Sequence, residues 1–186
     1  MNVKVQDIMK QSVATCSIQD PLQSAAQKMW DHDCGCLPVV DPDGRALAMI
    51  TDRDLCMAAL TTGKPLGDLR VGHSMSKQVL TCRPQEDITS AAQRMAKHGV
   101  RRLPVVDGAG KLVGILSLND LATAVAEDNA PRPGNTIAAE TLRVLTAVCR
   151  HRSVVPATIA GTGAVTTNPT PAPPAKTTPV SKEASV

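Results

Sequence analysis

The apolar and polar positions of the chain alternate in a way that predicts helices and strands in a fixed order. Four apolar residues recur at positions i, i+3, i+4 and i+7 and so share one face of a helix, namely Leu22, Ala25, Ala26 and Met29. Apolar runs at 37–40 and 45–50 flank the sequence Asp41-Pro42-Asp43-Gly44, which favours a turn, and together they predict a β-hairpin. A short apolar strand at 13–16 precedes these elements, and a second helix at 52–60 follows them. The predicted order is therefore β-α-β-β-α.

The same order of elements occurs a second time along the chain. Residues 5–60 align with residues 71–126 at an offset of 66 without a gap, and 21 of the 56 aligned positions are identical. The second copy repeats the apolar helix face with Ile88, Ala91, Ala92 and Met95. It also repeats the hairpin, around a turn at 107–110. The chain is therefore a tandem duplication, and we expect one repeat at 1–65 and a second at 66–129.

The composition predicts how the two copies pack. The chain has no Phe, no Tyr and a single Trp30, so its core must be built from aliphatic side chains and Met. One copy of this kind buries too little apolar surface to be stable alone. We therefore expect the two copies to pack sheet to sheet about a pseudo-two-fold axis and to share one core, with two related clefts that are each lined by both copies. Trp30 aligns with Ala96, and we expect it to be a packing or interface residue.

Beyond the second copy the composition changes. Residues 129–134 read Asn-Ala-Pro-Arg-Pro-Gly, which predicts a linker. Four apolar residues then share one helix face: Ile137, Val144, Leu145 and Val148. This accessory helix would be capped by Asn135 and end near Arg150, so that linker and helix together span 130–152. Residues 153–186 are dominated by Pro, Thr, Ala and Val, which predicts a disordered tail.

A short polar motif follows the hairpin of each copy. Thr51 and Asp54 are three residues apart at the passage from strand to helix, and Ser117 and Asp120 repeat this arrangement. In one interpretation the motif is a helix cap, because the hydroxyl satisfies free N–H groups and the acid suits the helix dipole. In the other it is a sugar-phosphate site, in which the hydroxyl and N–H groups face an anion and the aspartate accepts ribose hydroxyls. Its repetition favours the second interpretation.

The whole set of motifs, occurring twice in the same order, resembles a tandem pair of CBS domains. This is the regulatory repeat named after cystathionine β-synthase, and the pair is often called a Bateman module. The resemblance covers residues 5–126 and is carried by the V-x-T-C strand, the A-A-x-x-M helix, the L-P-V-V-D strand and the [ST]-x-x-D motif. It implies an α/β (α+β) fold of two β-α-β-β-α repeats about a pseudo-two-fold axis, followed here by the C-terminal helix and the disordered tail.

The resemblance also implies a ligand. Relatives bind adenosine-containing molecules such as AMP, ADP, ATP or S-adenosylmethionine in the clefts between the repeats, as regulatory ligands and not as resident cofactors. By this resemblance Asp54 and Asp120 would hold ribose hydroxyls, while Thr51 and Ser117 would meet the phosphate. Backbone groups after the first strand of each copy would help to place the base, at Thr15 and Thr81.

Basic residues distinguish the two copies. In adenylate-binding relatives, basic side chains just before the L-P-V-V-D strand reach the phosphates, and here Arg101 and Arg102 occupy these positions in the second copy. The first copy carries Gly35 and Cys36 instead. In the family such a pair tends to serve the cleft whose aspartate comes from the other copy. We therefore expect the arginines in the cleft of the first-copy aspartate, with Arg53 as an extra phosphate contact, and expect that cleft to bind anions more tightly.

Several classes of protein are not indicated. The net charge of +3 is mild and the aromatic stacking platforms of single-strand binders are absent, so nucleic acid binding is not expected. No apolar run approaches the roughly 18 residues of a membrane span, and the N-terminus does not read as a secretory signal. We therefore expect a cytoplasmic protein with reduced cysteines. No nucleophile-base set or phosphate-binding loop argues for an enzyme, and no cysteine or histidine spacing argues for a metal site.

The resemblance thus implies a non-enzymatic sensor of adenosine nucleotides that forms a homodimer, as the family commonly does, and regulates an enzyme or transporter in trans. The first alternative is a dimerisation or protein-interaction module whose ligand clefts are vestigial. The second alternative is a thiol-based sensor that uses Cys34 and Cys36, the one closely spaced cysteine pair of the chain.

Overall fold

The computed structural model describes residues 3–127 and 136–149. The predicted linker at 129–134, the proposed cap Asn135 and the predicted tail at 153–186 lie outside the described residues. The described elements are, in chain order, α1 (Val5–Ile8), β1 (Cys16–Ser17), α2 (Leu22–Asp31), β2 (Cys36–Val40), β3 (Ala46–Thr51), α3 (Asp52–Thr62), the 3-10 helix η1 (Leu66–Asp68), α4 (Val71–Ser74), α5 (Ile88–His98), β4 (Arg102–Val106), β5 (Leu112–Ser117), α6 (Leu118–Glu127) and α7 (Thr136–Cys149).

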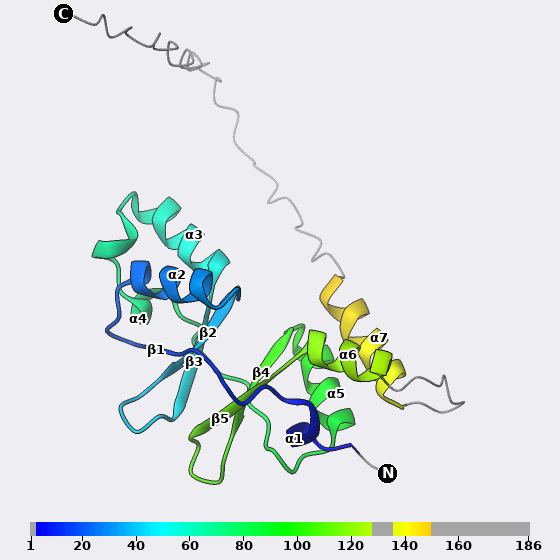
Figure 1. Ribbon diagram of the computed structural model, residues 1–186. Coiled ribbons are helices and arrows are strands. Elements are labelled where there is room, and N and C mark those ends of the chain that lie inside the picture. The colour runs from blue at the N-terminus through cyan, green and yellow to red at the C-terminus, as the bar shows by residue number, and fades with distance from the viewer. Residues whose placement is uncertain (1–2, 128–135, 150–186) are drawn as a thin grey trace, which may run out of the picture. The chain divides into compact units, whose positions relative to one another are not determined.

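Both predicted hairpins and the helices around them are confirmed (Figure 1). Strands β2 and β3 pair antiparallel, as do β4 and β5, and each pair has a register shift at the same place, Val39/Val40 and Val105/Val106. The first predicted strand is shorter than expected. In the first copy it is reduced to β1, which runs parallel to β2, and in the second copy only Cys82 pairs with Val105. Even the irregularities of the fold are therefore duplicated.

Two four-residue helices that the sequence analysis did not predict join the copies. Helix α1 precedes the first copy but belongs to the second, because Val5 donates its N–H to the Glu86 carbonyl at 3.0 Å. Helix α4 precedes the second copy but belongs to the first, because Val71 donates its N–H to the Asp20 carbonyl at 3.0 Å. These two hydrogen bonds are equivalent under the offset of 66. Each copy thus gives its N-terminal segment to the other.

This exchange corrects the prediction of one shared core. The described residues form two clusters of buried apolar side chains, one within each copy. Val71 is fully buried in the cluster of the first copy, and Val5 is fully buried in that of the second. A copy therefore completes its small core with a side chain from its neighbour's leading segment, which gives the mutual dependence that a thin aliphatic core requires.

The pseudo-two-fold axis passes close to the start of the second strand in each hairpin. There Ala46 donates its N–H to the Gly110 carbonyl at 3.2 Å, and Leu112 donates its N–H to the Gly44 carbonyl at 2.9 Å. The side chains opposite one another at this point belong to Arg45 and Lys111, which the offset of 66 also relates. The two hairpins thus bond to each other directly through their backbones.

Helix α7 has no counterpart in the first copy and packs against α5 and α6 of the second copy (Figure 1). Val144 is fully buried there, and Ile137 and Val148 pack against the same core. Leu145, which the sequence placed on this apolar face, is instead largely exposed. Among the described residues, no helix combines the length and the apolar character that crossing a bilayer would need.

The N-terminal segment crosses β5 of the second copy at Gly114, and a substitution there tests this close contact. A Cβ atom at this position would lie 2.8 Å from the Lys10 carbonyl oxygen and 2.9 Å from the Met9 sulfur. Gly114→Ala is therefore expected to lower the free energy of unfolding by about 1–3 kcal/mol, the usual cost of overpacking. Urea unfolding measures this, with Gly108→Ala as the matched control because a Cβ there meets nothing within 4 Å. If both variants were equally stable, the close contact between Gly114 and the segment at Met9 and Lys10 would be contradicted.

Candidate functional site

The duplicated polar motifs form closed hydrogen-bonded boxes at the starts of α3 and α6. In the first, Asp54 Oδ2 accepts from the Thr51 N–H at 2.8 Å and from the Thr51 hydroxyl at 2.7 Å, while the Asp54 N–H donates to Thr51 Oγ1 at 3.3 Å. In the second, Asp120 Oδ2 accepts from the Ser117 N–H at 2.7 Å and from its hydroxyl at 2.6 Å, and the Asp120 N–H donates to Ser117 Oγ at 3.2 Å. The helix-cap interpretation of both motifs is confirmed.

The cap does not exclude a second role for the aspartates. All of these bonds to the carboxylates use Oδ2, so within the part of the chain that the structure describes Oδ1 of each can accept from a hydroxyl donor. Asp120 is the more buried of the two, with 9% of its surface exposed. A carboxylate held in a fixed orientation at a helix N-terminus is preorganised to accept hydrogen bonds from a ligand.

Asp120 lies in a cleft of about 330 Å³ that both copies line. The second copy contributes Arg102, Ser117, Asn119 and Asp120 among its polar residues. The first copy contributes Lys10, Ser12, His32, Asp33 and Cys36. We call this space the Asp120 cleft. A cleft between the copies was expected from the sequence, and this one brings a capped carboxylate, two cationic side chains and the capped N-terminus of α6 together.

The charges of the Asp120 cleft differ from the expected distribution. The sequence analysis assigned Arg102 to the cleft of the first-copy aspartate, whereas the structure places it in the Asp120 cleft. Lys10 joins it because the exchanged N-terminal segment pairs with β5, with Lys10 N–H donating to the Ile115 carbonyl at 3.0 Å. The residues equivalent to Lys10 and Arg102 under the offset of 66 are Ser76 and Cys36, which are both uncharged. At these two pairs of aligned positions, both basic side chains therefore belong to the Asp120 cleft.

The other predicted phosphate contacts lie elsewhere. Arg101 is exposed and does not line the Asp120 cleft, and its carbonyl accepts the Leu118 N–H at 2.9 Å. Arg53 is exposed on the first turn of α3, where its N–H donates to Asp52 Oδ1 at 2.7 Å. Neither arginine is brought to Asp120 by the structure.

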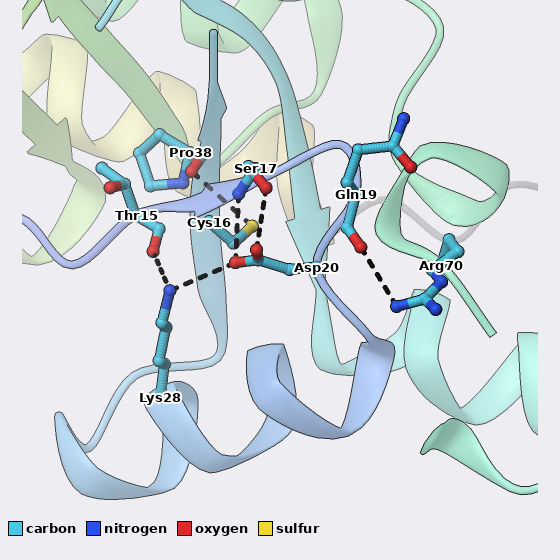
Figure 2. A network of polar contacts seen from close by, with 8 residues as sticks. All are labelled: Thr15, Cys16, Ser17, Gln19, Asp20, Lys28, Pro38 and Arg70. Carbon is cyan, nitrogen blue, oxygen red and sulfur yellow. Dashed lines mark hydrogen bonds and ion pairs between the residues drawn. The ribbon is translucent and has the colours of Figure 1, made fainter. Parts of the chain in front are cut away.

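Thr15 and Thr81 are tied to the first helix of their own copies. The Thr15 carbonyl accepts from Lys28 Nζ at 2.9 Å, and Lys28 also pairs with Asp20 at 3.2 Å (Figure 2). The same arrangement recurs at Thr81, whose carbonyl accepts from Arg94. Thr15 lines a separate small pocket of about 180 Å³ and not the Asp120 cleft. The observed role of these carbonyls is to anchor the strand to the helix.

Asp20 is the centre of the anchor in the first copy. Its carboxylate accepts from the Ser17 hydroxyl at 2.7 Å, from the Ser17 N–H at 3.2 Å and from Lys28 (Figure 2). Partial burial acts to raise the pKa of Asp20, but the hydrogen bonds from Ser17 and Lys28 outweigh it and the net effect lowers the pKa. The carboxylate is therefore charged at neutral pH and stabilises the native state in that form.

Three of the six cysteines are buried, namely Cys16, Cys36 and Cys82. Burial raises the pKa of Cys16 to about 11 and that of Cys82 to about 12, so neither thiol ionises at neutral pH. Burial also raises the pKa of Cys36, although the neighbouring Arg102 acts against it. All six cysteines are free. Within residues 3–127 and 136–149, no group of three or more His, Cys, Asp or Glu side chains is arranged to hold a metal ion.

The doubled fold agrees with a comparison against known families. The family model described as "CBS domain" matches residues 5–61 and again residues 66–127. The chain belongs to the CBS domain family. The two matches coincide with the two copies seen in the structure, so the resemblance inferred from the sequence motifs is confirmed.

The relatives include a bacterial CBS domain-containing protein and solved CBS proteins with bound ligands. The CBS domain-containing protein YhcV of Bacillus subtilis (strain 168) is 40% identical over 118 residues, which cover 63% of this chain and 82% of YhcV. The CBS domain pair of protein MJ0100, solved in complex with 5′-methylthioadenosine and S-adenosyl-L-methionine, has a TM-score of 0.62 at 26% identity and covers 69% of this chain and 99% of its own. CBSX2 in complex with AMP has a TM-score of 0.60 at 25% identity, with coverages of 68% and 98%.

Sequence reasoning missed Lys10 as a member of the cleft. Its position depends on the exchange of the leading segments, and nothing in the composition around Met9 and Lys10 signals that exchange. The duplication itself offers an indirect signal, because Lys10 of the first copy aligns with an uncharged residue, Ser76, of the second copy. Such unequal pairs mark the places where two related clefts differ.

The lowered pKa of Asp20 predicts a pH dependence of stability. Because the native state favours the ionised form, this stabilisation is present above the pKa of the unfolded chain, near 4, and is lost as the pH falls through the native pKa. Asp20→Asn should therefore lower the free energy of unfolding at pH 7 by about 0.5–1 kcal/mol, a modest effect because the carboxylate is partly exposed. Urea unfolding across pH should show the two proteins converging in acid. A difference that does not change with pH would contradict the ionised anchor.

Proposed function

We propose that this chain is a cytoplasmic regulatory module that binds an anionic adenosine-containing ligand in the Asp120 cleft and acts without catalysis. One observation carries the proposal: the cleft between the copies combines the capped Asp120 carboxylate with Arg102 and Lys10. The ligands of its structural neighbours, namely AMP, S-adenosyl-L-methionine and 5′-methylthioadenosine, support an adenosine compound.

Each group in the cleft has a chemical role in this proposal. Asp120 Oδ1 accepts hydrogen bonds from the two ribose hydroxyls, since a carboxylate is a strong acceptor and Oδ2 is already occupied by the cap. The first turn of α6, from which Asn119 lines the cleft, turns the positive end of the helix dipole toward the negative end of the ligand. Arg102 and Lys10 neutralise its phosphate or carboxylate charge, and Arg102 can do so through two parallel hydrogen bonds.

The first-copy aspartate would serve a different or weaker ligand. Asp54 has the same capped geometry as Asp120, so ribose recognition is equally available to it. The residues equivalent to the two cations of the Asp120 cleft are Ser76 and Cys36. We therefore assign the tighter anion site to Asp120, which reverses the preference drawn from the sequence, and a less charged adenosine ligand to Asp54.

Regulation would follow from the position of the ligand between the copies. A ligand that contacts residues of both copies favours the relative arrangement in which it binds more tightly, and it shifts the population only by that difference in affinity. The regulated enzyme or transporter would then recognise one arrangement in trans. In the competing hypothesis the clefts are vestigial and the module only mediates protein contacts, a view that predicts no ligand response at all.

Thermal unfolding with AMP, ADP, ATP or S-adenosylmethionine tests ligand binding. A ligand at about 100 times its dissociation constant should stabilise the native state by roughly 2.7 kcal/mol, which gives a clear rise in melting temperature. Asp120→Asn should abolish the rise, because the amide presents a weaker acceptor to the ribose hydroxyls while its oxygen can still accept the cap hydrogen bonds. Asp54→Asn is the matched control and should leave the strongest response in place.

The outcome also separates the two hypotheses. Ribose 5-phosphate, which lacks the base, should give a much smaller rise than AMP. A flat response to every adenosine ligand would support the protein-interaction hypothesis. A response that is lost in Asp54→Asn and kept in Asp120→Asn would show that the ligand binds at Asp54, as the sequence analysis predicted.

The charge of the ligand can be tested at Arg102. Arg102→Gln should weaken the binding of AMP by about 10–100-fold, the scale of charge-assisted hydrogen bonds. The same change should alter the affinity for uncharged 5′-methylthioadenosine much less. Isothermal titration of both ligands against both proteins measures this, and an equal loss for the two ligands would show that Arg102 does not recognise charge.

A further inference from the structure

The Asp120 cleft carries an acidic side chain that the ligand contacts described above do not use. Asp33, in the loop after α2, lines this cleft together with Lys10 and Arg102. The ion pairs among the described residues involve none of these three side chains, although their charges are of opposite sign. The carboxylate of Asp120 is already engaged by the cap of α6. Asp33 therefore offers the cleft a second carboxylate, one that has no partner in the part of the chain that the structure describes.

The backbone at Asp33 has a conformation that few side chains adopt. Its φ is 46°, in the left-handed region, and no other described residue except glycine has a positive φ. Glycine is the usual residue for this conformation, while Asp and Asn are the side chains that tolerate it best. A residue kept in a left-handed conformation at the wall of a cleft points to a function of its side chain there.

The second copy has the usual residue at the equivalent position. Gly99 corresponds to Asp33 under the offset of 66, and its φ is 63°. The backbone hydrogen bonds of the two turns also correspond, because the Asp33 N–H donates to the Trp30 carbonyl at 3.2 Å and the Gly99 N–H donates to the Ala96 carbonyl at 3.3 Å. The turn therefore forms equally well without a carboxylate. The acidic side chain is an addition in the first copy, and it lines the Asp120 cleft.

We propose that Asp33 makes the Asp120 cleft selective for an adenosine ligand that carries a cationic group beside its anionic group. This inference rests on the proposed function and narrows its class of ligand. Lys10 and Arg102 bind the carboxylate or phosphate of the ligand, and Asp33 pairs with an ammonium or sulfonium group. S-adenosylmethionine is a ligand of this class, because its methionine part carries a carboxylate, an ammonium group and a sulfonium.

The same carboxylate disfavours ligands whose charged groups are all negative. A phosphate beside Asp33 is repelled, and each further phosphate near it adds to the repulsion. The formal charges of Lys10 and Arg102 are balanced by those of Asp33 and Asp120, so these four side chains give the cleft no excess of positive charge. Such a cleft suits a ligand with charges of both signs better than a polyphosphate. Removing the charge of Asp33 should therefore change the affinities for the two kinds of ligand in opposite directions.

Isothermal titration of Asp33→Asn at low ionic strength tests the inference, because salt would screen the effect. Asparagine keeps the size of the side chain and tolerates the left-handed backbone, but it removes the charge. The dissociation constant of S-adenosylmethionine should rise about two- to fivefold, the range of exposed ion pairs, and that of AMP should fall by a similar factor. The affinity for 5′-methylthioadenosine, which has neither an ammonium group nor a phosphate, should not change.

Asp31→Asn is the matched control, because Asp31 is an exposed carboxylate at the end of α2 that does not line the cleft. It should leave all three affinities unchanged. Asp33→Gly, which copies the residue of the second copy, should reproduce the opposite shifts of Asp33→Asn. Thermal unfolding confirms that each variant is folded.

The outcomes separate this inference from the proposed function. Shifts in the same direction for S-adenosylmethionine and AMP, no shift for either, or equal shifts in Asp31→Asn would overturn the selective role of Asp33 and leave the proposed function in place. If the unsubstituted protein bound none of the three ligands, both the proposed function and the role of Asp33 would be overturned.

Discussion

The reciprocal exchange of leading segments is the constraint on which the rest of the structure depends. Val5 and Val71 are each fully buried in the core of the other copy, and paired backbone hydrogen bonds hold both segments in place. A copy without Phe or Tyr has a small aliphatic core, so the side chain it receives is a considerable part of its buried surface. The cleft between the copies therefore exists only when both copies are folded together, which suits a site that must sense their arrangement.

The same exchange makes the two clefts unequal. The leading segment of the first copy brings Lys10 to the Asp120 cleft, while the equivalent residue of the second copy is Ser76, whose hydroxyl accepts the Met49 N–H at 3.0 Å and donates to the Gln78 carbonyl at 2.9 Å. Arg102 and Cys36 form a second unequal pair. The hairpin backbones have stayed symmetric, down to their register shifts, whereas Lys10 and Arg102, which replace uncharged residues of the other copy, both line the Asp120 cleft.

Much of the fold could be predicted from the sequence because the signals are local and occur twice. Hairpins with Asp and Gly at their turns and helices with apolar faces need no knowledge of tertiary contacts. Helices α1 and α4 could not be predicted, since four residues with one buried Val have no detectable period. The aspartates of the site follow from a local motif, whereas the cleft that Arg102 enters depends on the path of a strand between two copies. Lys10 depends on the exchange itself, which no local pattern encodes.

One short loop lines both the Asp120 cleft and an apolar groove between α2 and α3. Asp33, Cys34 and Gly35 line both the Asp120 cleft and the groove between α2 and α3. The loop is conformationally restricted, because Asp33 has a positive φ of 46° and a Cβ at Gly35 would lie 3.0 Å from the Asp52 carboxylate. A ligand that changes the preferred conformation of this loop changes the shape of the groove at the same time. Linkage between two binding events is reciprocal, so any partner that bound in this groove and changed the loop would alter the affinity of the Asp120 cleft, and the ligand would alter the affinity of the groove by the same factor.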